Sequence, residues 1–583
     1  PDLEYWREQV KCQEACPAHT DARGYVRAIS AGKPELAYLI ARGPNPLASI
    51  CGRICGAPCE EACRRGDLDN PIAIRALKRY VCEQFGPETG SSRAKSLLEF
   101  LREASGRHES SPCQSKDELL PFLQSLTAGD IPKVSGKSVG IIGSGPAGLS
   151  AAHDLALLGF SVTMYEMEPV LGGMLAAGVP DYRLSRELVA AEVETISALG
   201  VEAVTDCFVG EDVSFPELRE RHDAVIVAAG AKRSRSLDLP GAEGPGVMGG
   251  VEFLRDVFVG EPPKLAGTVV VIGGGNVAYD VGRTVVRQIS LDAARTAKRA
   301  EDVGDVYLCS LESLEEMPAD DVEIIEGDEE GIIRRNGLGP KEILRDEEGN
   351  VSAVRFKRCL RVYDENRNFN PIFDEDDITE IECDTVLLAI GQSYDIWFVD
   401  AERDGLEMTD RGLIACDSET GETSAPDVFV AGDLAYGTKL LIHAVASGKA
   451  VARAIYKRLT GCPVEARDLE LHFPLVTYER EKDYEKRNRI DPPTISPEER
   501  LADPSRLVER MYPDSQARCE AGRCLDCGVN TIFDGDRCIL CGGCVDVCPE
   551  MCLRIVSPGR LDVDDPVREV LSAQLGDAAA ADR

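Results

Sequence analysis

The chain has 583 residues, enough for roughly four domains of ordinary size. Hydrophobic residues make up 43% of it, which excludes a chain that is disordered throughout. The formal net charge of −36 indicates a solvated acidic surface and argues against a nucleic-acid partner bound through a general basic field. Because no apolar run approaches the roughly 20 residues of a membrane helix and the first residues do not form a signal peptide, we expect a cytoplasmic protein without membrane insertion.

The 22 cysteines gather at the two ends of the chain. Seven lie within the first 82 residues and eight between positions 519 and 552, while the 436 residues between them hold seven that are placed singly. This number is too small for a disulfide scaffold in a chain of this length. The distribution predicts two metal-binding modules on either side of an organic-cofactor core.

The segments in chain order predict a multidomain α/β protein. Residues 1–85 have helical periodicity, clearest at 24–41 and 71–82. Two similar strand–turn–helix segments begin near 138 and 268, and the second interrupts the first, so we expect two nested Rossmann-type domains. The predicted segments are a helical domain (1–85), a linker (86–136), a first Rossmann-type domain (137–267 and 380–465), a second one (268–379), a second linker (466–516), a small α+β domain (517–565) and an acidic tail (566–583).

The first glycine fingerprint predicts an FAD site. It reads Gly143-Ser-Gly145-Pro146-Ala147-Gly148, between a strand and a helix, where backbone N–H groups can approach a pyrophosphate. Glu166 ends the next predicted strand, in place to bind an adenosine ribose. Further along, Gly432-Asp433 ends a buried strand before a helix at 440–457, and in two-dinucleotide flavoproteins such an Asp binds the ribityl chain.

The second fingerprint predicts a nicotinamide nucleotide site. It reads Gly273-Gly-Gly275-Asn276-Val277-Ala278, and the strand that follows runs into Leu311-Glu312-Ser313. A 2′-phosphate would need an Arg here, whereas a free ribose 2′-OH needs a carboxylate, so Glu312 favours NAD(H) over NADP(H). Two alternatives stay open: Glu312 points to water, or the Lys/Arg-containing helix at 295–299 supplies a phosphate contact.

The C-terminal cysteines predict iron–sulfur clusters. The run Cys538-x2-Cys541-x2-Cys544-x3-Cys548-Pro549 is the one used by bacterial ferredoxins, whose fourth Cys serves a neighbouring cluster. Zinc usually takes two cysteine pairs separated by a dozen or more residues, so this run favours iron–sulfur. Ligands of a second cluster in this ferredoxin-like domain are expected from Cys524, Cys527 and Cys552, with Cys519 as a further candidate.

The middle of the chain resembles the small subunit of glutamate synthase, the flavin half of dihydropyrimidine dehydrogenase and the large subunit of the bifurcating ferredoxin:NADP transhydrogenases. The resemblance rests on Gly172-Gly173-Met174-Leu-Ala-Ala-Gly178-Val-Pro180-Asp-Tyr-Arg183-Leu184, on Glu315-Glu-Met-Pro-Ala319 and on Leu387-Leu-Ala-Ile-Gly391. It implies FAD contacts from Gly173, Met174, Arg183 and Leu441, and a nucleotide contact at Gly391. The group usually has Arg-Arg-Ser where this chain has Leu311-Glu312-Ser313, and this departure weakens the expectation of NADP(H).

The N-terminal cysteines resemble the helical cluster domain of the same family, through Cys12-x3-Cys16-Pro17 and Cys51-Gly-Arg-Ile-Cys55-Gly-Ala-Pro-Cys59-Glu-Glu-Ala-Cys63. The resemblance implies one [4Fe–4S] cluster on Cys16, Cys55, Cys59 and Cys63. The family's second N-terminal cluster needs a CxxC pair upstream of Cys12 and a Glu or Gln near position 78, where this chain has Lys78, which cannot ligate while protonated. Cys12 and Cys51 are further candidate ligands, and Cys82 is expected in the core.

These features predict a flavin and iron–sulfur oxidoreductase that uses FAD, NAD(H) and two or three [4Fe–4S] clusters. A flavin exchanges hydride with a nicotinamide and single electrons with clusters, so we expect the NAD(H) module of a larger hetero-oligomeric redox complex, with a ferredoxin or iron–sulfur subunits as partners. The reactive centre is the flavin N5, and no side chain is assigned as the catalyst. The alternatives are an NADPH-dependent glutamate synthase small subunit and an electron-relay or assembly subunit without nucleotide turnover of its own.

Overall fold

The computed structural model describes residues 9–89, 134–265, 267–295, 303–464 and 487–527, with 541, 543–546, 569 and 573 beyond them. The chain divides into two compact units, Pro1–Cys527 and Gly528–Arg583, and the described part of the second contains one short helix, α22 (Gly543–Asp546). The first predicted linker (86–136), the predicted ferredoxin-like domain (517–565) and the acidic tail (566–583) lie mostly outside the described residues, and Cys538, Cys548 and Cys552 lie entirely outside them. Within the described ranges, no helix is both long enough and apolar enough to cross a membrane.

Short helices make up the N-terminal part of the first unit. Asp21 begins one of them by accepting a hydrogen bond from Gly24 N at 2.8 Å, and Pro34 opens the next, where its missing N–H is not needed. The helical region predicted at 24–41 is therefore two helices, which meet at Gly32 (φ +71°). The helices are α2 (Lys11–Glu14), α3 (Ala22–Ser30), α4 (Pro34–Arg42), α5 (Ala48–Ile54), α6 (Pro58–Glu61) and α7 (Ile74–Phe85), with 3-10 turns η1 (Arg64–Asp67) and η2 (Pro87–Thr89).

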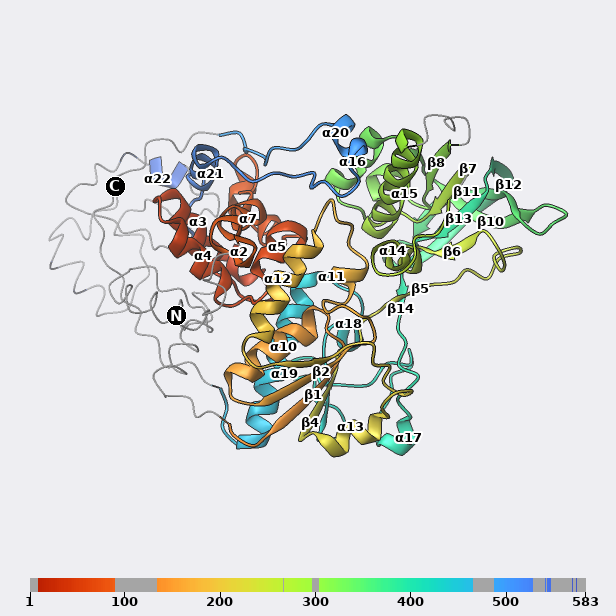
Figure 1. The fold of residues 1–583 in the computed structure, drawn as a ribbon. Coiled ribbons are helices and arrows are strands. Elements are labelled where there is room, and N and C mark those ends of the chain that lie inside the picture. Colours follow the sequence, from red (N-terminus) through yellow and green to blue (C-terminus); the bar gives the residue numbers. More distant parts are fainter. Residues whose placement is uncertain are drawn as a thin grey trace. The chain divides into compact units, whose positions relative to one another are not determined.

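The first parallel sheet has the strand order β15-β4-β1-β2-β3 (Figure 1). Its strands are β1 (Ser138–Ile142), β2 (Ser161–Tyr165), β3 (Glu202–Val204), β4 (Ala224–Val227) and β15 (Val428–Val430). The central strands are nearly continuous apolar runs, as expected where helices cover both faces of a sheet. Helices α10 (Pro146–Leu157) and α19 (Leu441–Thr460) pack so closely that a Cβ at Gly448 would stand 2.1 Å from the carbonyl oxygen of Ala147. Helices α12 (Arg186–Ser197) and α13 (Phe215–Arg221) belong to the same domain.

The second parallel sheet has the order β6-β13-β7-β8-β9. Its strands are β6 (Val247–Gly249), β7 (Gly267–Ile272), β8 (Val303–Cys309), β9 (Ile333–Arg335) and β13 (Thr385–Leu388). Its helices are α14 (Gly250–Phe258), α15 (Asn276–Arg295) and α16 (Asp321–Glu330), with a 3-10 turn η4 (Leu314–Glu316). A three-stranded antiparallel sheet follows, with strands β10 (Leu338–Arg345), β11 (Val351–Tyr363) and β12 (Phe369–Glu382).

The two sheets confirm the nested Rossmann-type arrangement, because β15 pairs with β4 only after the whole second domain has been passed. The predicted boundaries at 267 and 380 nevertheless cut the second sheet, since β6 and β13 pair with each other in it. The chain crosses between the domains at β5 (Arg233–Ser234) and β14 (Gln392–Ser393), which pair antiparallel. Apolar runs of three or four residues do not reveal which of two sheets they join.

Residues 487–527, which we call the strap, include the second part of the predicted linker 466–516. This part is packed against the protein and is not a linker. The strap contains α20 (Pro497–Ala502) and α21 (Asp514–Ala521) and is docked on two earlier domains. Arg500 is buried and donates to Glu329 on α16 at 2.9 Å, while Tyr512 and Ala517 belong to the core of the N-terminal helices. The charged composition that is typical of a linker therefore forms ion pairs with the rest of the first unit.

Candidate functional site

The first glycine loop joins β1 to α10. Gly143 has φ +97°, and a Cβ there would stand 2.6 Å from the carbonyl oxygen of Ala228, so only glycine fits this turn. A Cβ at Gly145, by contrast, would meet no atom within 4 Å, which leaves open space beside the first turn of α10. Pro146 is the first residue of that helix, and no side chain caps it. The loop therefore presents backbone donors to open space, as binding of a pyrophosphate requires.

Glu166, at the end of β2, is held against this loop. One carboxylate oxygen accepts hydrogen bonds from Ser144 N at 2.9 Å and Ser144 Oγ at 2.6 Å, and the other accepts from Glu168 N at 3.0 Å. Gly173 lies against the same loop, since its φ is +54° and a Cβ there would be 2.8 Å from Gly145 Cα. Met174 begins the short helix α11 (Met174–Ala177) that follows.

Gly432 and Asp433 lie where β15 ends, at the same edge of the first sheet. A Cβ at Gly432 would stand 3.0 Å from the Cβ of Ala147, so this turn meets the first glycine loop. Asp433 begins α18 (Asp433–Tyr436), and burial raises the pKa of its carboxyl to about 6. Leu441 is half-buried at the start of α19, and His443 Nδ1 in the same turn is buried with no hydrogen-bond partner among the described residues. An unpartnered ring nitrogen near open glycine turns fits a site for a bound flavin.

Arg183, which the family resemblance assigned to FAD, has other partners in the structure. Its guanidinium donates to both oxygens of Asp280 at 2.8 and 2.9 Å and pairs with Glu323 at 3.1 Å. Asp280 lies on α15 and Glu323 on α16, so Arg183 ties the first Rossmann-type domain to the second. The local motif around Arg183 did not reveal these partners because both carboxylates come much later in the chain.

The second glycine loop joins β7 to α15 and repeats the geometry of the first. A Cβ at Gly273 would stand 2.3 Å from the carbonyl oxygen of Ala389, whereas one at Gly275 would meet no atom within 4 Å. Asn276 donates to Asp320 Oδ2 at 3.1 Å and accepts from Asp320 N at 2.8 Å. This reciprocal pair fixes the start of α16 beside the loop.

Glu312 faces the second loop from the end of β8. Its Oε2 would lie 2.6 Å from a Cβ at Gly274, and burial raises the pKa of the carboxyl. The structure also brings in Arg335, which local sequence reasoning missed, because β9 pairs with β8. The Arg335 guanidinium lies over the Tyr307 ring, 5.6 Å from its centroid. Val277 is half-buried in the first turn of α15 and Gly391 has φ +113°, while the Lys/Arg-containing segment at 295–299 lies almost wholly outside the described residues.

Four N-terminal cysteines lie close enough to the buried side chain of Lys78 for their charges to affect its pKa. We call this group the Lys78 cysteine site; its members are Cys16, Cys51, Cys55 and Cys59. Burial opposes the charge of Lys78, but the four thiols outweigh burial and raise its pKa, so the amine stays an ammonium. A hydrogen bond with Cys51, aided by the Lys78 charge, lowers the pKa of the Cys55 thiol, which also accepts from Ala57 N at 3.4 Å.

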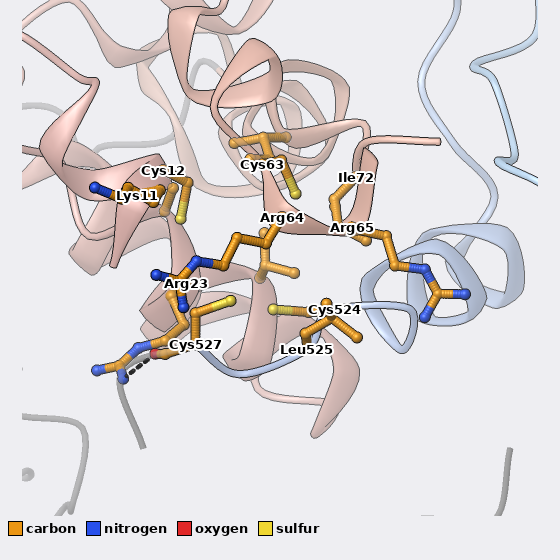
Figure 2. Close-up of a pocket in the computed structure, with 13 residues that line it drawn as sticks. Lys11, Cys12, Arg23, Cys63, Arg64, Arg65, Ile72, Cys524, Leu525 and Cys527 are labelled. Carbon is orange, nitrogen blue, oxygen red and sulfur yellow. Dashed lines mark hydrogen bonds between the residues drawn. The ribbon is translucent and has the colours of Figure 1, made fainter. Parts of the chain in front are cut away.

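The remaining N-terminal cysteines meet the strap in a second site. We call it the strap cysteine site; its members are Cys12, Cys63, Cys524 and Cys527, which line one pocket (Figure 2). Figure 2 shows their sulfur atoms pointing toward one another across that pocket. Burial and the neighbouring thiols raise the pKa of Cys12, while Arg64 and Arg23 oppose the effect of burial on Cys527.

Two predicted groupings of cysteines differ from these sites. Cys63 lines one pocket with Cys12, and Cys51 joins the predicted ligands Cys16, Cys55 and Cys59 among the thiols that affect Lys78. Cys524 and Cys527 lie in the first unit, not with the ferredoxin-type run of the second. Cys82 is fully buried, as expected, Cys519 is exposed on α21, and Cys541 and Cys544 are exposed in the second unit.

Both cysteine sites offer thiol side chains, the kind of ligand that an iron–sulfur cluster takes. Among the residues that the structure describes, no three His, Cys, Asp or Glu side chains are placed to hold one metal ion. Four thiolates on one zinc must all reach the same atom, whereas a [4Fe–4S] cluster takes four thiolates at separate irons. Both cysteine sites supply such a set of four.

Comparisons with known proteins match three separate parts of the chain: the nucleotide-binding region, the N-terminal helical region and the C-terminal cysteine run. Residues 137–448 match the pyridine nucleotide-disulphide oxidoreductase family, 7–89 match the 4Fe-4S cluster domain II of dihydropyrimidine dehydrogenase, and 531–554 match a 4Fe-4S binding domain. The NADP(+)-dependent formate dehydrogenase subunit beta of Moorella thermoacetica is 36% identical over 88% of this chain and 70% of its own length. The NADPH-Fe(3+) oxidoreductase subunit beta of Geobacter sulfurreducens is 30% identical over 88% of this chain and 75% of its own length. The glutamate synthase [NADPH] small chain of Mycobacterium tuberculosis is 29% identical, over 77% and 86% respectively.

Proposed function

The chain belongs to the pyridine nucleotide-disulphide oxidoreductase family, and on that premise we propose that it is the flavin and iron–sulfur subunit of a larger redox complex, exchanging hydride with NAD(H) and single electrons with its clusters. The observation that carries this proposal is the pair of glycine loops, one at the end of each nested parallel sheet and each with a carboxylate held over it. Two of the relatives are named as beta subunits and a third as a small chain, which supports a role inside a complex with other redox subunits.

FAD belongs at the first loop. The glycines and the first turn of α10 hold the pyrophosphate, Glu166 the adenosine ribose, and Asp433 the ribityl chain. The other proposed FAD contacts are Pro146, Ala147, Gly173, Met174, Gly432 and Leu441. Arg183 is a positioning residue, because its side chain is engaged by Asp280 and Glu323.

The Lys78 cysteine site is next to the proposed flavin site. A bound flavin converts between hydride transfer and single-electron transfer. Leu440, at the start of α19, contacts the residue after Cys55, since a Cβ at Gly56 would lie 2.7 Å from its Cδ2. Cys16 and Cys51 share one apolar core with residues of the first Rossmann-type domain. This packing supports electron exchange between the flavin and a cluster held there.

The second loop is proposed to bind NAD(H) in preference to NADP(H). Glu312 lies against the loop, so its carboxylate can accept hydrogen bonds from a ribose and would repel a 2′-phosphate. The relatives above are named for NADP(+) or NADPH, so in this respect the chain is proposed to differ from them. Arg335, on the neighbouring strand, is a candidate for an opposing effect.

Anaerobic reduction of the full-length protein tests the proposal. NADH should bleach the flavin absorbance faster than NADPH, and Glu312→Arg should raise the ratio of NADPH to NADH rates by about tenfold or more, equivalent to about 1.4 kcal/mol. Glu315→Arg, which adds the same charge on the exposed turn that follows, is the matched control and should leave the ratio nearly unchanged. Failure of both nucleotides to reduce the flavin would instead favour a relay subunit without turnover of its own.

A second candidate function is a glutamate synthase small subunit, favoured by the Mycobacterium tuberculosis relative. It uses the same two nucleotide sites. The match of 531–554 to a 4Fe-4S binding domain argues for a different partner, because it adds a cluster module beyond the two nucleotide domains. Faster reduction of the flavin by NADPH than by NADH would favour the glutamate synthase small subunit.

A further inference from the structure

The strap cysteine site joins residues from opposite ends of the first unit. We propose that Cys12, Cys63, Cys524 and Cys527 together bind one [4Fe–4S] cluster, so that the strap completes a metal site of the N-terminal helical region. The proposal extends the iron–sulfur part of the proposed function and is independent of the two nucleotide sites.

The pocket has the shape and lining that such a cluster needs. Its four thiols come from three parts of the chain, namely α2, the turn after α6 and the end of the strap, and they face one another in Figure 2. The whole pocket, which other residues also line, holds about 420 Å³ of space that protein atoms do not fill, with open solvent included. The apolar part of the remaining wall is formed by Ala22, Val26, Ile72, Ile74 and Leu525. A thiolate-ligated cluster fits this combination of sulfur ligands and apolar shielding.

The charges around the pocket also fit an anionic cluster. Four thiolates bring more negative charge than the iron core neutralises, and buried negative charge needs compensation. Lys11, Arg23, Arg64 and Arg65 all line the pocket. Arg23 additionally donates to the carbonyl oxygen of Cys527 at 2.8 Å, which holds that residue in place.

Buried ion pairs fix the strap against the N-terminal helices next to the site. Arg523 precedes Cys524 directly and donates to Asp69 at 2.8 Å and to Glu520 at 2.6 Å. Arg65 donates to the same Asp69 at 2.8 Å and to the Arg523 carbonyl at 3.2 Å. All of these side chains are less than 10% exposed. The two cysteines of the strap are therefore held in place by buried ion pairs and hydrogen bonds between the strap and the N-terminal helices.

The cysteine count of the C-terminal segment agrees with this assignment. With Cys524 and Cys527 in the first unit, the second unit keeps the run Cys538, Cys541, Cys544 and Cys548, with Cys552 behind it. The 4Fe-4S binding domain match covers 531–554 and leaves out both strap cysteines. The chain then has three cluster sites, or about twelve irons for three [4Fe–4S] clusters.

Iron analysis of single and double variants tests the pairing. In anaerobically purified full-length protein, Cys12→Ala and Cys527→Ala should each remove about four irons per chain, and the double variant should remove the same four, because both residues serve one cluster. Cys462→Ala is the control, since Cys462 is an exposed cysteine that belongs to none of the cysteine sites, and it should keep all its iron. Retained FAD shows that each variant is folded.

Additive losses, about eight irons in the double variant, would overturn the proposal, because Cys12 and Cys527 would then serve separate clusters. If a variant loses FAD as well, whether Cys12 and Cys527 bind the same cluster can be tested in the unmodified protein. During stepwise removal of iron by a chelator, Cys12 and Cys527 should become reactive to alkylation together. Joint labelling of Cys527 with Cys541, and not with Cys12, would contradict the shared site.

Discussion

Next to each of the two cysteine sites, one buried glutamate accepts hydrogen bonds from the backbone of the N-terminal helices. The two glutamates differ in their other hydrogen-bond partners. Glu192 on α12 accepts from Ser49 N at 3.0 Å and Ile50 N at 3.4 Å, in the first turn of α5, which carries Cys51. Glu520 in the strap accepts from Ala73 N at 3.0 Å, from Ile490 N at 2.8 Å and from the Arg523 guanidinium at 2.6 Å. Both carboxylates thus join a distant segment to backbone N–H groups of the N-terminal helices.

The difference in partners has a physical consequence. Burial raises the pKa of Glu192 to about 7, although the charge of Arg42 opposes this, so near neutral pH this carboxyl shares its charge with a proton. Glu520 has a guanidinium in direct contact, which compensates the burial of its charge. The helix that carries Cys51 is therefore held by a carboxyl that responds to pH, namely Glu192. The strap cysteine site is held by the ion pair between Glu520 and Arg523.

The largest effect is expected from Glu520→Ala. It removes one of the two carboxylates paired with the buried Arg523, which keeps Asp69, and it leaves the backbone N–H groups of Ala73 and Ile490 without their acceptor. These losses should weaken docking of the strap by about 3 kcal/mol. Cleavage of the strap in limited proteolysis should then rise by about two orders of magnitude, and the iron of the strap cysteine site should be lost.

Glu498→Ala supplies the control, because Glu498 is an exposed residue of the same strap. It should change neither the cleavage rate nor the iron content. If Glu520→Ala keeps all its iron while the strap is cleaved freely, the cluster does not depend on the docked strap.

A smaller effect, confined to one site, is expected from Lys78→Met. Removing a positive charge beside four thiolates disfavours the more negative reduced state, so the reduction potential of this cluster should fall by on the order of 100 mV. The iron content should stay unchanged, because an ammonium is no ligand. Redox titration followed by electron paramagnetic resonance measures the shift, and the second N-terminal cluster serves as the internal reference.

Lys78→Arg keeps the charge and should keep the potential close to that of the unmodified protein. A shift of similar size in both clusters, or in the arginine variant, would mean that the substitution acts through packing and not through charge.

Much of the fold could be predicted because its signals are local. In each unit the glycine loop, the apolar strand before it and the acidic residue after the next strand all lie within about 46 residues, in the order that a Rossmann-type unit imposes. The sheet membership of β6 and β13 could not be predicted, since it depends on pairing across more than 130 residues. The docking of the strap was missed for a similar reason, because its charged residues find partners near the other end of the chain.

The cysteine sites show the same limit at the level of single residues. Cys55 and Cys59 could be grouped from their spacing, but Cys63 lines a pocket with Cys12 that Cys59, four residues earlier, does not line. The turn at Cys63, which starts η1, directs its side chain into the pocket with Cys12. Spacing alone predicted the type of ligand, whereas the tertiary fold decides which four cysteines meet.

The smallest expected effect is a pH dependence of the free energy of unfolding that comes from Glu192, beside the Lys78 cysteine site. The folded-state pKa of Glu192, about 7, lies above its unfolded value of about 4.5, so its contribution to stability is fully present below pH 4.5 and is lost as pH rises through 7. Between pH 6 and 8 this loss amounts to about 1.4 kcal/mol, and it should be absent in Glu192→Gln, which keeps one acceptor for Ser49 N. Thermal unfolding monitored by release of FAD at pH 6, 7 and 8 measures the difference, with Glu194→Gln, an exposed residue of the same helix, as the control. Equal slopes in the unmodified protein and in Glu192→Gln would show that this carboxyl stays charged in the folded state, and the contrast with Glu520 would then vanish.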